Sequence, residues 1–211
     1  SSDVCSSDLI PRASLQLEHC WENCAIDFVG PFPGHIYILI LVDYRSKWPE
    51  ATMLKSATSQ KIISVLTGVF CSFGNPKVLL FDNGPQFTSE EFESFLKLNG
   101  IQHCKTSPYS PKANRQVERF HRYLEHSIRA AELDGFLCTE VLPDILQVYR
   151  SSPHAGTVMT PATLMLNRDI TTESRKKESS LKKDTNAIKK NYVIMLMRND
   201  PLLITLQSVP E

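Results

Sequence analysis

Short apolar runs separated by turn residues most constrain the fold of this 211-residue chain. The longest run, IYILILV at residues 36–42, is far shorter than the roughly 20 residues that cross a bilayer, so no membrane span is expected. Three strand-like runs come first, at 25–29, 36–42 and 48–54, with Gly30-Pro31 and Pro33-Gly34 as the first turn. The N-terminal part therefore predicts an antiparallel meander.

Helical and strand patterns then alternate along the chain. A helical stripe over 58–73 ends at Gly74, and the capping box Thr88-Ser-Glu-Glu91 opens a second helix. Buried strands are expected after each of these helices, at 77–81 and 101–106. Further helices are expected from near Asn114, over 141–149 and after Thr160-Pro161. This order predicts an α/β protein with a mixed five-stranded sheet and helices on both faces.

The total charge at first argues against a nucleic-acid partner. Twenty-three Lys and Arg balance 23 Asp and Glu, so the formal net charge is zero, whereas basic proteins bind nucleic acid or anionic membrane surfaces. The neutrality is a cancellation between segments, because residues 1–100 carry −4 and residues 101–130 carry +4. The basic segment 101–130 is either a solvated helix face or a phosphate-binding surface.

The cysteines predict neither a disulfide scaffold nor a metal site. Six cysteines in this length are too sparse for a disulfide framework and indicate reduced thiols of an intracellular protein. His19-Cys20 and Cys24 resemble half of a zinc site, but no second ligand pair at suitable spacing follows. No structural zinc is therefore expected.

Both ends differ from the middle of the chain. Residues 1–9 (SSDVCSSDL) follow no helical or strand period and are similar to a translated sequencing-adapter read. We interpret residues 1–17 as a non-native or truncated leader and 18–170 as the folded domain. Residues 171–211 form a basic tail that we expect to be disordered or frameshifted.

Three acidic residues stand where packing does not explain a carboxylate. Asp27 lies inside the first strand, Asp82 ends a buried strand, and Glu118 lies early in a helix, with 35 residues between Asp82 and Glu118. Taken singly, Asp82 could merely hold the following turn and Glu118 could be a solvated helix residue. Converging carboxylates repel one another unless cations neutralise them, and their oxygen ligands suit Mg²⁺ or Mn²⁺. Two such ions about 3.5–4 Å apart can activate a water or a 3′-hydroxyl for attack on a phosphodiester.

Four segments of the sequence resemble the catalytic core of a retroviral-type integrase, of the kind carried by Ty3/gypsy LTR retrotransposons. They are WENCAIDFVGPF at 21–32, YILILVDYRSKWPEA at 37–51, FGNPKVLLFDNGPQFTSEEF at 73–92 and SPYSPKANRQVERFHR at 107–122. The likeness runs from about residue 21 to residue 168 and keeps order and spacing. It implies a ribonuclease-H-like fold and a D,D-35-E triad of catalytic, metal-binding residues, here Asp27, Asp82 and Glu118.

The resemblance also implies a reaction, a cofactor and partners. The reaction is 3′-processing of retroelement DNA ends followed by their transfer into target DNA in the nucleus. The implied cofactor is Mg²⁺ or Mn²⁺, with two ions when DNA is bound. The implied partners are the element's DNA ends, the target DNA and further copies of the chain, as a homodimer or higher oligomer, and no membrane.

Polar and basic residues around the triad are candidates for DNA contacts. Residues 107–116 form a loop suited to closing over DNA, in which Tyr109 could stack on a base or sugar. Arg122 and Arg129 recur on the helical face that bears Glu118, where a row of cations can meet phosphates. The full candidate set is Asn83, Gln86, Tyr109, Lys112, Asn114, Arg115, Gln116, Arg119, Arg122 and Arg129. His103, His121 and His126 are expected to be solvated or hydrogen-bonded.

One departure from the family's pattern keeps two alternatives open. The family usually has Gly three residues before the catalytic Glu, and this chain has Arg115 there. A side chain at this position stiffens the loop, although an added cation could strengthen DNA binding. The alternatives are a non-catalytic relic, or pseudogene fragment, that binds nucleic acid or protein, and a metal-dependent nuclease on the same fold.

Overall fold

A computed structural model describes residues 19–81, 84–105, 115–154 and 156–170. Within these residues one mixed sheet has the strand order β3-β2-β1-β4-β5. The antiparallel pairs are β1–β2 and β2–β3, and the parallel pairs are β1–β4 and β4–β5. The strands are β1 (Asn23–Phe32), β2 (Ile36–Asp43), β3 (Pro49–Leu54), β4 (Val78–Phe81) and β5 (Gln102–Lys105). The predicted five-stranded mixed sheet is thereby confirmed.

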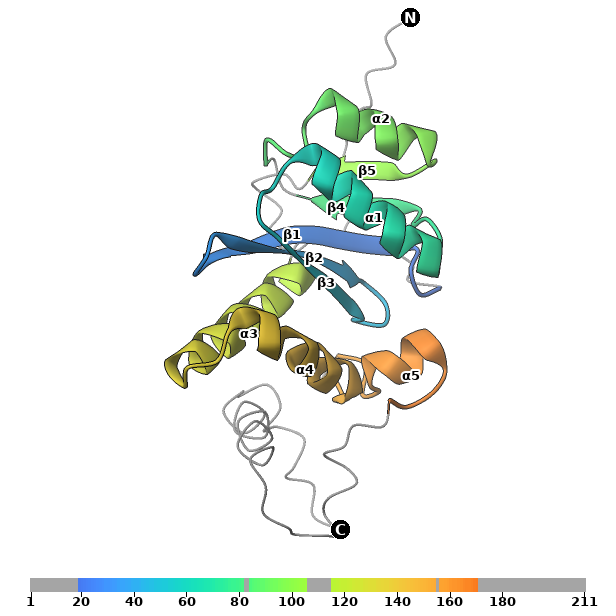
Figure 1. Ribbon diagram of the computed structural model, residues 1–211. Helices are drawn as coiled ribbons and strands as arrows, with labels where there is room; N and C mark the ends of the chain where they lie inside the picture. The colour runs from blue at the N-terminus through green and yellow to red at the C-terminus, as the bar shows by residue number, and fades with distance from the viewer. Residues whose placement is uncertain (1–18, 82–83, 106–114, 155, 171–211) are drawn as a thin grey trace, which may run out of the picture.

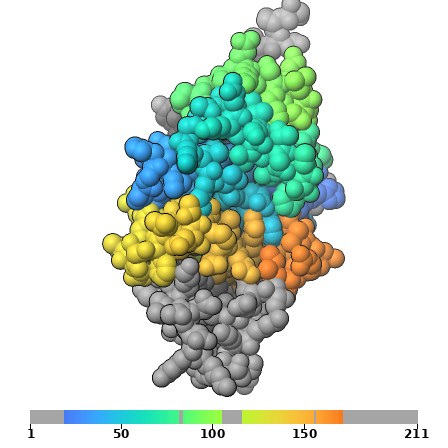
Figure 2. Space-filling view, viewed as in Figure 1, coloured from blue at the N-terminus to red at the C-terminus, as the bar shows by residue number. Residues whose placement is uncertain are grey.

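Helices cover both faces of this sheet, as predicted. They are α1 (Ser59–Phe73), α2 (Glu90–Leu98), α3 (Arg115–Leu133), α4 (Cys138–Ser151) and α5 (Pro161–Leu166). The sheet lies between α1 and α2 on one side and α3 and α4 on the other, with α5 beside α4 (Figure 1). Figure 2 shows the same layers filled by side chains, with α3 and α4 packed beneath the strands, while Ala162 of α5 joins the buried cluster on the α1 side. None of the helices in the described part of the chain is long and apolar enough to cross a membrane.

Alternation along β1 decides which side chains meet α3. Successive residues of a strand point to opposite faces, and Ala25 and Val29 belong to the buried cluster beneath α3, whereas Ile26 packs in the cluster beneath α1. Helix α3 lies on its face of the sheet because Phe120 and Leu124 are fully buried there. Odd-numbered residues in this part of β1 therefore point toward α3.

The first strand is longer than its sequence predicts. A turn was expected at Gly30-Pro31, but β1 continues through these residues to Phe32, with an irregularity in register between Val29 and Phe32. Phe32 is only 6% exposed and pairs with Ile36. Because burial of this aromatic ring favours the extended pairing, the turn falls at residues 33–35.

The helix ends follow the predicted signals, with one correction. Thr160 caps α5 by accepting a hydrogen bond from the Thr163 amide at 3.0 Å, as expected, and α1 ends at Gly74. The expected capping box from Thr88 to Glu91 is wrong, because Ser89 is the N-cap of α2 and accepts from the Phe92 amide. The register is one residue later than predicted.

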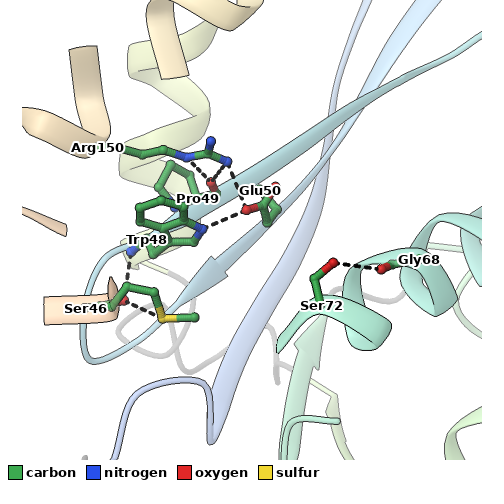
Figure 3. Close-up of polar contacts among 8 residues, drawn as sticks. Ser46, Trp48, Pro49, Glu50, Gly68, Ser72 and Arg150 are labelled. Carbon is green, nitrogen blue, oxygen red and sulfur yellow. Dashed lines mark hydrogen bonds and ion pairs between the residues drawn. The ribbon is translucent and has the colours of Figure 1, made fainter. Parts of the chain in front are cut away.

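Helix α4 is fastened to the edge strand β3 by Arg150 (Figure 3). The Arg150 guanidinium lies 4.3 Å from the centre of the Trp48 ring and 3.0 Å from Glu50 Oε1. It also donates to the Pro49 carbonyl at 2.8 and 3.1 Å, while Trp48 Nε1 donates to Glu50 at 2.7 Å. These contacts fix the start of β3 and, with it, the β2–β3 turn that approaches α3.

Candidate active site

The carboxylate of Asp27 lies on the central strand and faces α3. Its Oδ1 accepts a hydrogen bond from the Phe28 amide at 2.8 Å, and its Oδ2 lies 2.7 Å from Nδ1 of His121 on α3. The Asp27 side chain is 19% exposed, so solvent still reaches it. The structure thus joins two residues that are 94 positions apart in the sequence.

His121 lies among three carboxylates. The hydrogen bond that His121 donates to Asp27 is the main cause that raises the pKa of His121, and the charges of Asp27, Glu125 and Glu118 raise it further, against the opposing effect of burial. The Nε2 atom of His121 is 4.0 Å from Glu125 Oε2. The three carboxylates thus favour the protonated form of the His121 ring.

Glu118 is an exposed residue in the first turn of α3, one turn before His121. Its charge raises the pKa of His121 and contributes, after burial and Cys24, to raising the pKa of Tyr44. Residues three apart on a helix are surface neighbours, so Glu118 and Asp27 approach His121 from different elements. Two of the three predicted catalytic carboxylates therefore lie in one neighbourhood.

Several sequence-predicted residues lie outside the described part of the chain: Asp82, Asn83, Tyr109, Lys112 and Asn114. For these residues the predicted roles stay predictions. Phe81, which precedes Asp82, ends β4, the strand that pairs with β1. Arg115 is the first residue of α3, although its side chain also falls outside the description.

Gln116 connects the start of α3 to the β2–β3 turn. Its Nε2 donates to the Asp43 carbonyl at 2.6 Å, and its Oε1 accepts from Lys47 Nζ at 2.7 Å. Lys47 also donates to the Tyr44 carbonyl at 2.5 Å, and burial lowers its pKa, with the charge of Arg119 acting in the same direction. Both polar atoms of the Gln116 side chain thus form hydrogen bonds within the protein. These bonds fix the backbone two residues before Glu118.

The predicted arginine contacts have different surroundings. Arg119 and Arg122 are exposed on α3, whereas Arg129, also exposed, pairs with Glu125 at 2.7 Å. Gln86 is half-buried in the turn before α2, and its carbonyl accepts from Ser59 Oγ at 3.0 Å. Arg119 and Arg122 therefore present the charges most available to phosphate among these residues.

The donor set fits a hard divalent cation. Asp27 and Glu118 supply carboxylate oxygens, the ligands preferred by Mg²⁺ and Mn²⁺, at a site that solvent reaches. Over the ranges described, no three His, Cys, Asp or Glu side chains form a complete metal cluster. Asp82, the third predicted ligand, lies outside those ranges.

His121 is the residue whose place sequence reasoning missed. The prediction was a solvated or hydrogen-bonded histidine, and the hydrogen bond is confirmed, but its partner Asp27 was not foreseen. The available signal was the three-residue spacing from Glu118, which puts both side chains on one side of α3. The sequence does not show which face of β1 packs against this side of α3, because the two elements are far apart in the chain.

Known proteins resemble this chain in sequence and in fold. Residues 21–111 match the model of the integrase core domain family. The chain is 33% identical over 153 residues to an uncharacterised protein of Caenorhabditis elegans, covering 72% of this chain and 12% of that protein. It is 35% identical over 140 residues to the Pol polyprotein of Radiation murine leukemia virus (strain Kaplan), covering 64% of this chain and 24% of that polyprotein. The chain thus spans less than a quarter of the length of these curated relatives.

A solved structure shares the fold. The HTLV-2 integrase catalytic core domain, determined in complex with magnesium, aligns with a TM-score of 0.59 at 19% identity, over 70% of this chain and 97% of that one. At this identity the likeness establishes the fold, which is ribonuclease-H-like as predicted.

Proposed function

Because residues 21–111 of this chain match the model of the integrase core domain family, we propose that the protein catalyses polynucleotidyl transfer on DNA. The specific steps proposed are 3′-end processing of retroelement DNA and transfer of the processed ends into target DNA. The observation that carries the proposal is the hydrogen bond between Asp27 on β1 and His121 on α3, because His121 lies one helical turn after Glu118. A carboxylate pair on the sheet and this helix can serve a phosphodiester substitution.

We propose that Asp27 and Glu118 hold Mg²⁺ or Mn²⁺, together with Asp82. When bound, such an ion supplies Lewis-acid stabilisation of the charge that develops on the phosphodiester oxygens. Three carboxylates suffice for two ions, the number proposed for the DNA-bound state. The chain's own contribution is to hold the Asp27 carboxylate rigidly through the Phe28 amide and His121.

DNA is the proposed substrate, and the exposed arginines of α3 support it. Arg119 and Arg122 follow Glu118 on the solvent side of the helix, where they can neutralise phosphates in a salt-dependent way. Arg129 is proposed as a weaker contact because Glu125 already pairs with it. Handling two DNA ends further favours a homodimer or higher oligomer acting in the nucleus.

The helical start of α3 bears on the relic alternative. A residue other than Gly stiffens the loop before the catalytic Glu, but Arg115 is the first residue of α3. Helical backbone is open to any L-residue, so Arg115 does not require the conformations that are special to Gly. We therefore favour an active enzyme over a binding relic.

The test is a DNA assay with Mn²⁺ and two labelled duplexes, a blunt-ended donor whose 3′ end must be shortened before it can join, and a target. The wild-type chain is expected to yield shortened strands from processing and lengthened strands from joining, whereas Asp82→Asn yields neither. Arg115→Gly is expected to keep activity within about tenfold of wild type, a change of about 1.4 kcal/mol in the barrier.

Each alternative has its own outcome in this assay. Shortened strands without any lengthened strands indicate a nuclease. Absence of both products from the wild type and from Arg115→Gly contradicts the active-enzyme proposal. Equal products from wild type and Asp82→Asn indicate a contaminating nuclease.

A further inference from the structure

The hydrogen bond between His121 and Asp27 has a defined direction. An ionised carboxylate can only accept hydrogen bonds, so Nδ1 of His121 carries the hydrogen that Asp27 Oδ2 accepts at 2.7 Å. This direction is the same for the neutral ring protonated at Nδ1 and for the imidazolium. Together with the Phe28 amide on Oδ1, it gives each carboxylate oxygen of Asp27 one donor from the protein.

The His121 ring is itself held in place. Its neighbours Phe120 and Leu124 on α3 are fully buried, so the helix cannot shift without disturbing the core. On the other side of the ring, Nε2 faces Glu125 Oε2 at 4.0 Å, and Glu125 Oε1 pairs with Arg129 Nη2 at 2.7 Å. A row of alternating acidic and basic groups thus runs from Asp27 outward along α3.

We propose that His121 is a positioning residue that orients the Asp27 carboxylate for binding a divalent cation. The inference rests on the proposed function, because it needs Asp27 to be a metal ligand. Groups that hydrogen-bond to metal ligands fix ligand orientation, and removing them typically lowers metal affinity or activity about 10–100-fold. His121 occupies this place for Asp27, with a short contact from a rigid helix.

Replacing His121 by Asn or by Gln distinguishes the position of the hydrogen-bond donor from other properties of the imidazole ring. In His121→Asn the side-chain nitrogen lies as many bonds from Cα as Nδ1 does, and in His121→Gln it lies one bond further. The Asn side chain can therefore donate a hydrogen bond to Asp27 Oδ2 from the position of Nδ1. The Gln side chain cannot, because its nitrogen lies beyond that position. His126→Asn is the matched control, because His126 is exposed on the same helix.

The measurement is Mn²⁺ binding to the full chain, followed by the electron paramagnetic resonance signal of free Mn²⁺, with Asp27→Asn as the baseline. His121→Gln and His121→Ala are expected to weaken Asp27-dependent binding about tenfold or more, and His121→Asn is expected to stay within about threefold of wild type. Thermal melting of each variant identifies any loss of folding. His121→Ala and His121→Gln each remove the hydrogen bond to Asp27 in a different way.

A second readout is strand joining as a function of Mn²⁺ concentration. The Mn²⁺ concentration that gives half-maximal joining is expected to rise in His121→Gln and to return toward the wild-type value in His121→Asn. A purely structural role for His121 would lower the melting temperature without moving this midpoint.

The outcomes separate this inference from the proposed function. If wild type and Asp27→Asn bind Mn²⁺ equally, both the proposed metal site and the positioning role fail. If Asp27 is required but His121→Gln and His121→Ala bind as tightly as wild type, only the positioning role is overturned. Equal weakening by His126→Asn overturns it as well, since the effect is then not specific to the contact with Asp27.

Discussion

At the scale of single residues, Gly30 is a position where the backbone itself requires a specific amino acid. Its φ is +119°, and a Cβ there would lie 2.8 Å from the Ile36 carbonyl oxygen. Gly30→Ala is expected to destabilise the fold by about 1–3 kcal/mol, the usual cost of a strained backbone, measured by urea denaturation.

Gly68 is the matched control for this substitution. It lies inside α1, and an added Cβ would meet nothing within 4 Å. Gly68→Ala is expected to stabilise the protein by about 0.5–1 kcal/mol, because Ala favours the helix over Gly. A Gly30→Ala variant as stable as wild type would contradict the geometry of the β1–β2 hairpin.

The residues of the site were predictable to different degrees. Asp27 and Glu118 could be singled out because a carboxylate inside a strand, or beside Val117 and Phe120, lacks a packing explanation. The role of His121 could not, since a histidine carries no such conflict and its partner is 94 positions away. Sequence patterns therefore reveal residues that conflict with their local pattern, such as Asp27, more readily than residues that contact them, such as His121.

At the scale of elements, the β2–β3 turn positions the start of α3. Asp43, only 1% exposed, accepts from the Trp21 amide at 2.9 Å and from the Ser46 amide at 2.7 Å. The turn so fixed presents the Asp43 carbonyl and Lys47 to Gln116. Because Gln116 lies two residues before Glu118, this connection determines where the first turn of the helix sits.

A double-mutant cycle tests that connection. Lys47→Met and Gln116→Leu each remove one side of the hydrogen bond between them, and the pair is expected to couple by about 1 kcal/mol in urea denaturation. Gln102→Leu, on β5, combined with Lys47→Met serves as the control pair and is expected to be additive. Additivity of Lys47→Met with Gln116→Leu would mean that the contact does not hold α3.

Element ends were predictable to within about one residue where a local hydrogen bond decides them, and not where burial does. Thr160 and Gly74 follow from capping chemistry within a few residues. The continuation of β1 to Phe32 is decided instead by burial of that ring, and a local turn signal at Gly30-Pro31 was misleading. The choice of Ser89 over Thr88 as N-cap shifts a helix start by one residue, which local sequence does not resolve.

At the scale of the whole molecule, total charge is a poor guide to partners. A net charge of zero conceals an acidic N-terminal half that contributes Asp27 and a basic segment around Glu118. In the fold these segments meet, since α3 packs on β1 and β2. Three of the carboxylates that offset the positive charge are proposed to hold cations, so neutrality and DNA binding are compatible.

Thiol labelling tests the layered architecture. Cys24 lies in the central strand with no exposed surface, and burial raises the pKa of its thiol well above the usual value, with Asp43 adding to the effect. Cys71 is exposed on α1. Iodoacetamide followed by mass spectrometry is expected to modify Cys71 in the native protein and Cys24 only after denaturation, because the thiolate is the reactive form. Equal labelling rates would contradict the position of β1 at the centre of the sheet.

The most direct test of the central claim, that carboxylates from β1 and α3 carry out DNA strand transfer, compares two identical substitutions on one helix. Glu118→Gln removes the proposed ligand, and Glu132→Gln changes the same side chain near the far end of α3. The rate of Mn²⁺-dependent strand joining is expected to fall at least about 100-fold in Glu118→Gln, as loss of several kcal/mol of charge stabilisation requires. Glu132→Gln is expected to join strands at the wild-type rate. Equal joining rates for the two variants would contradict the account.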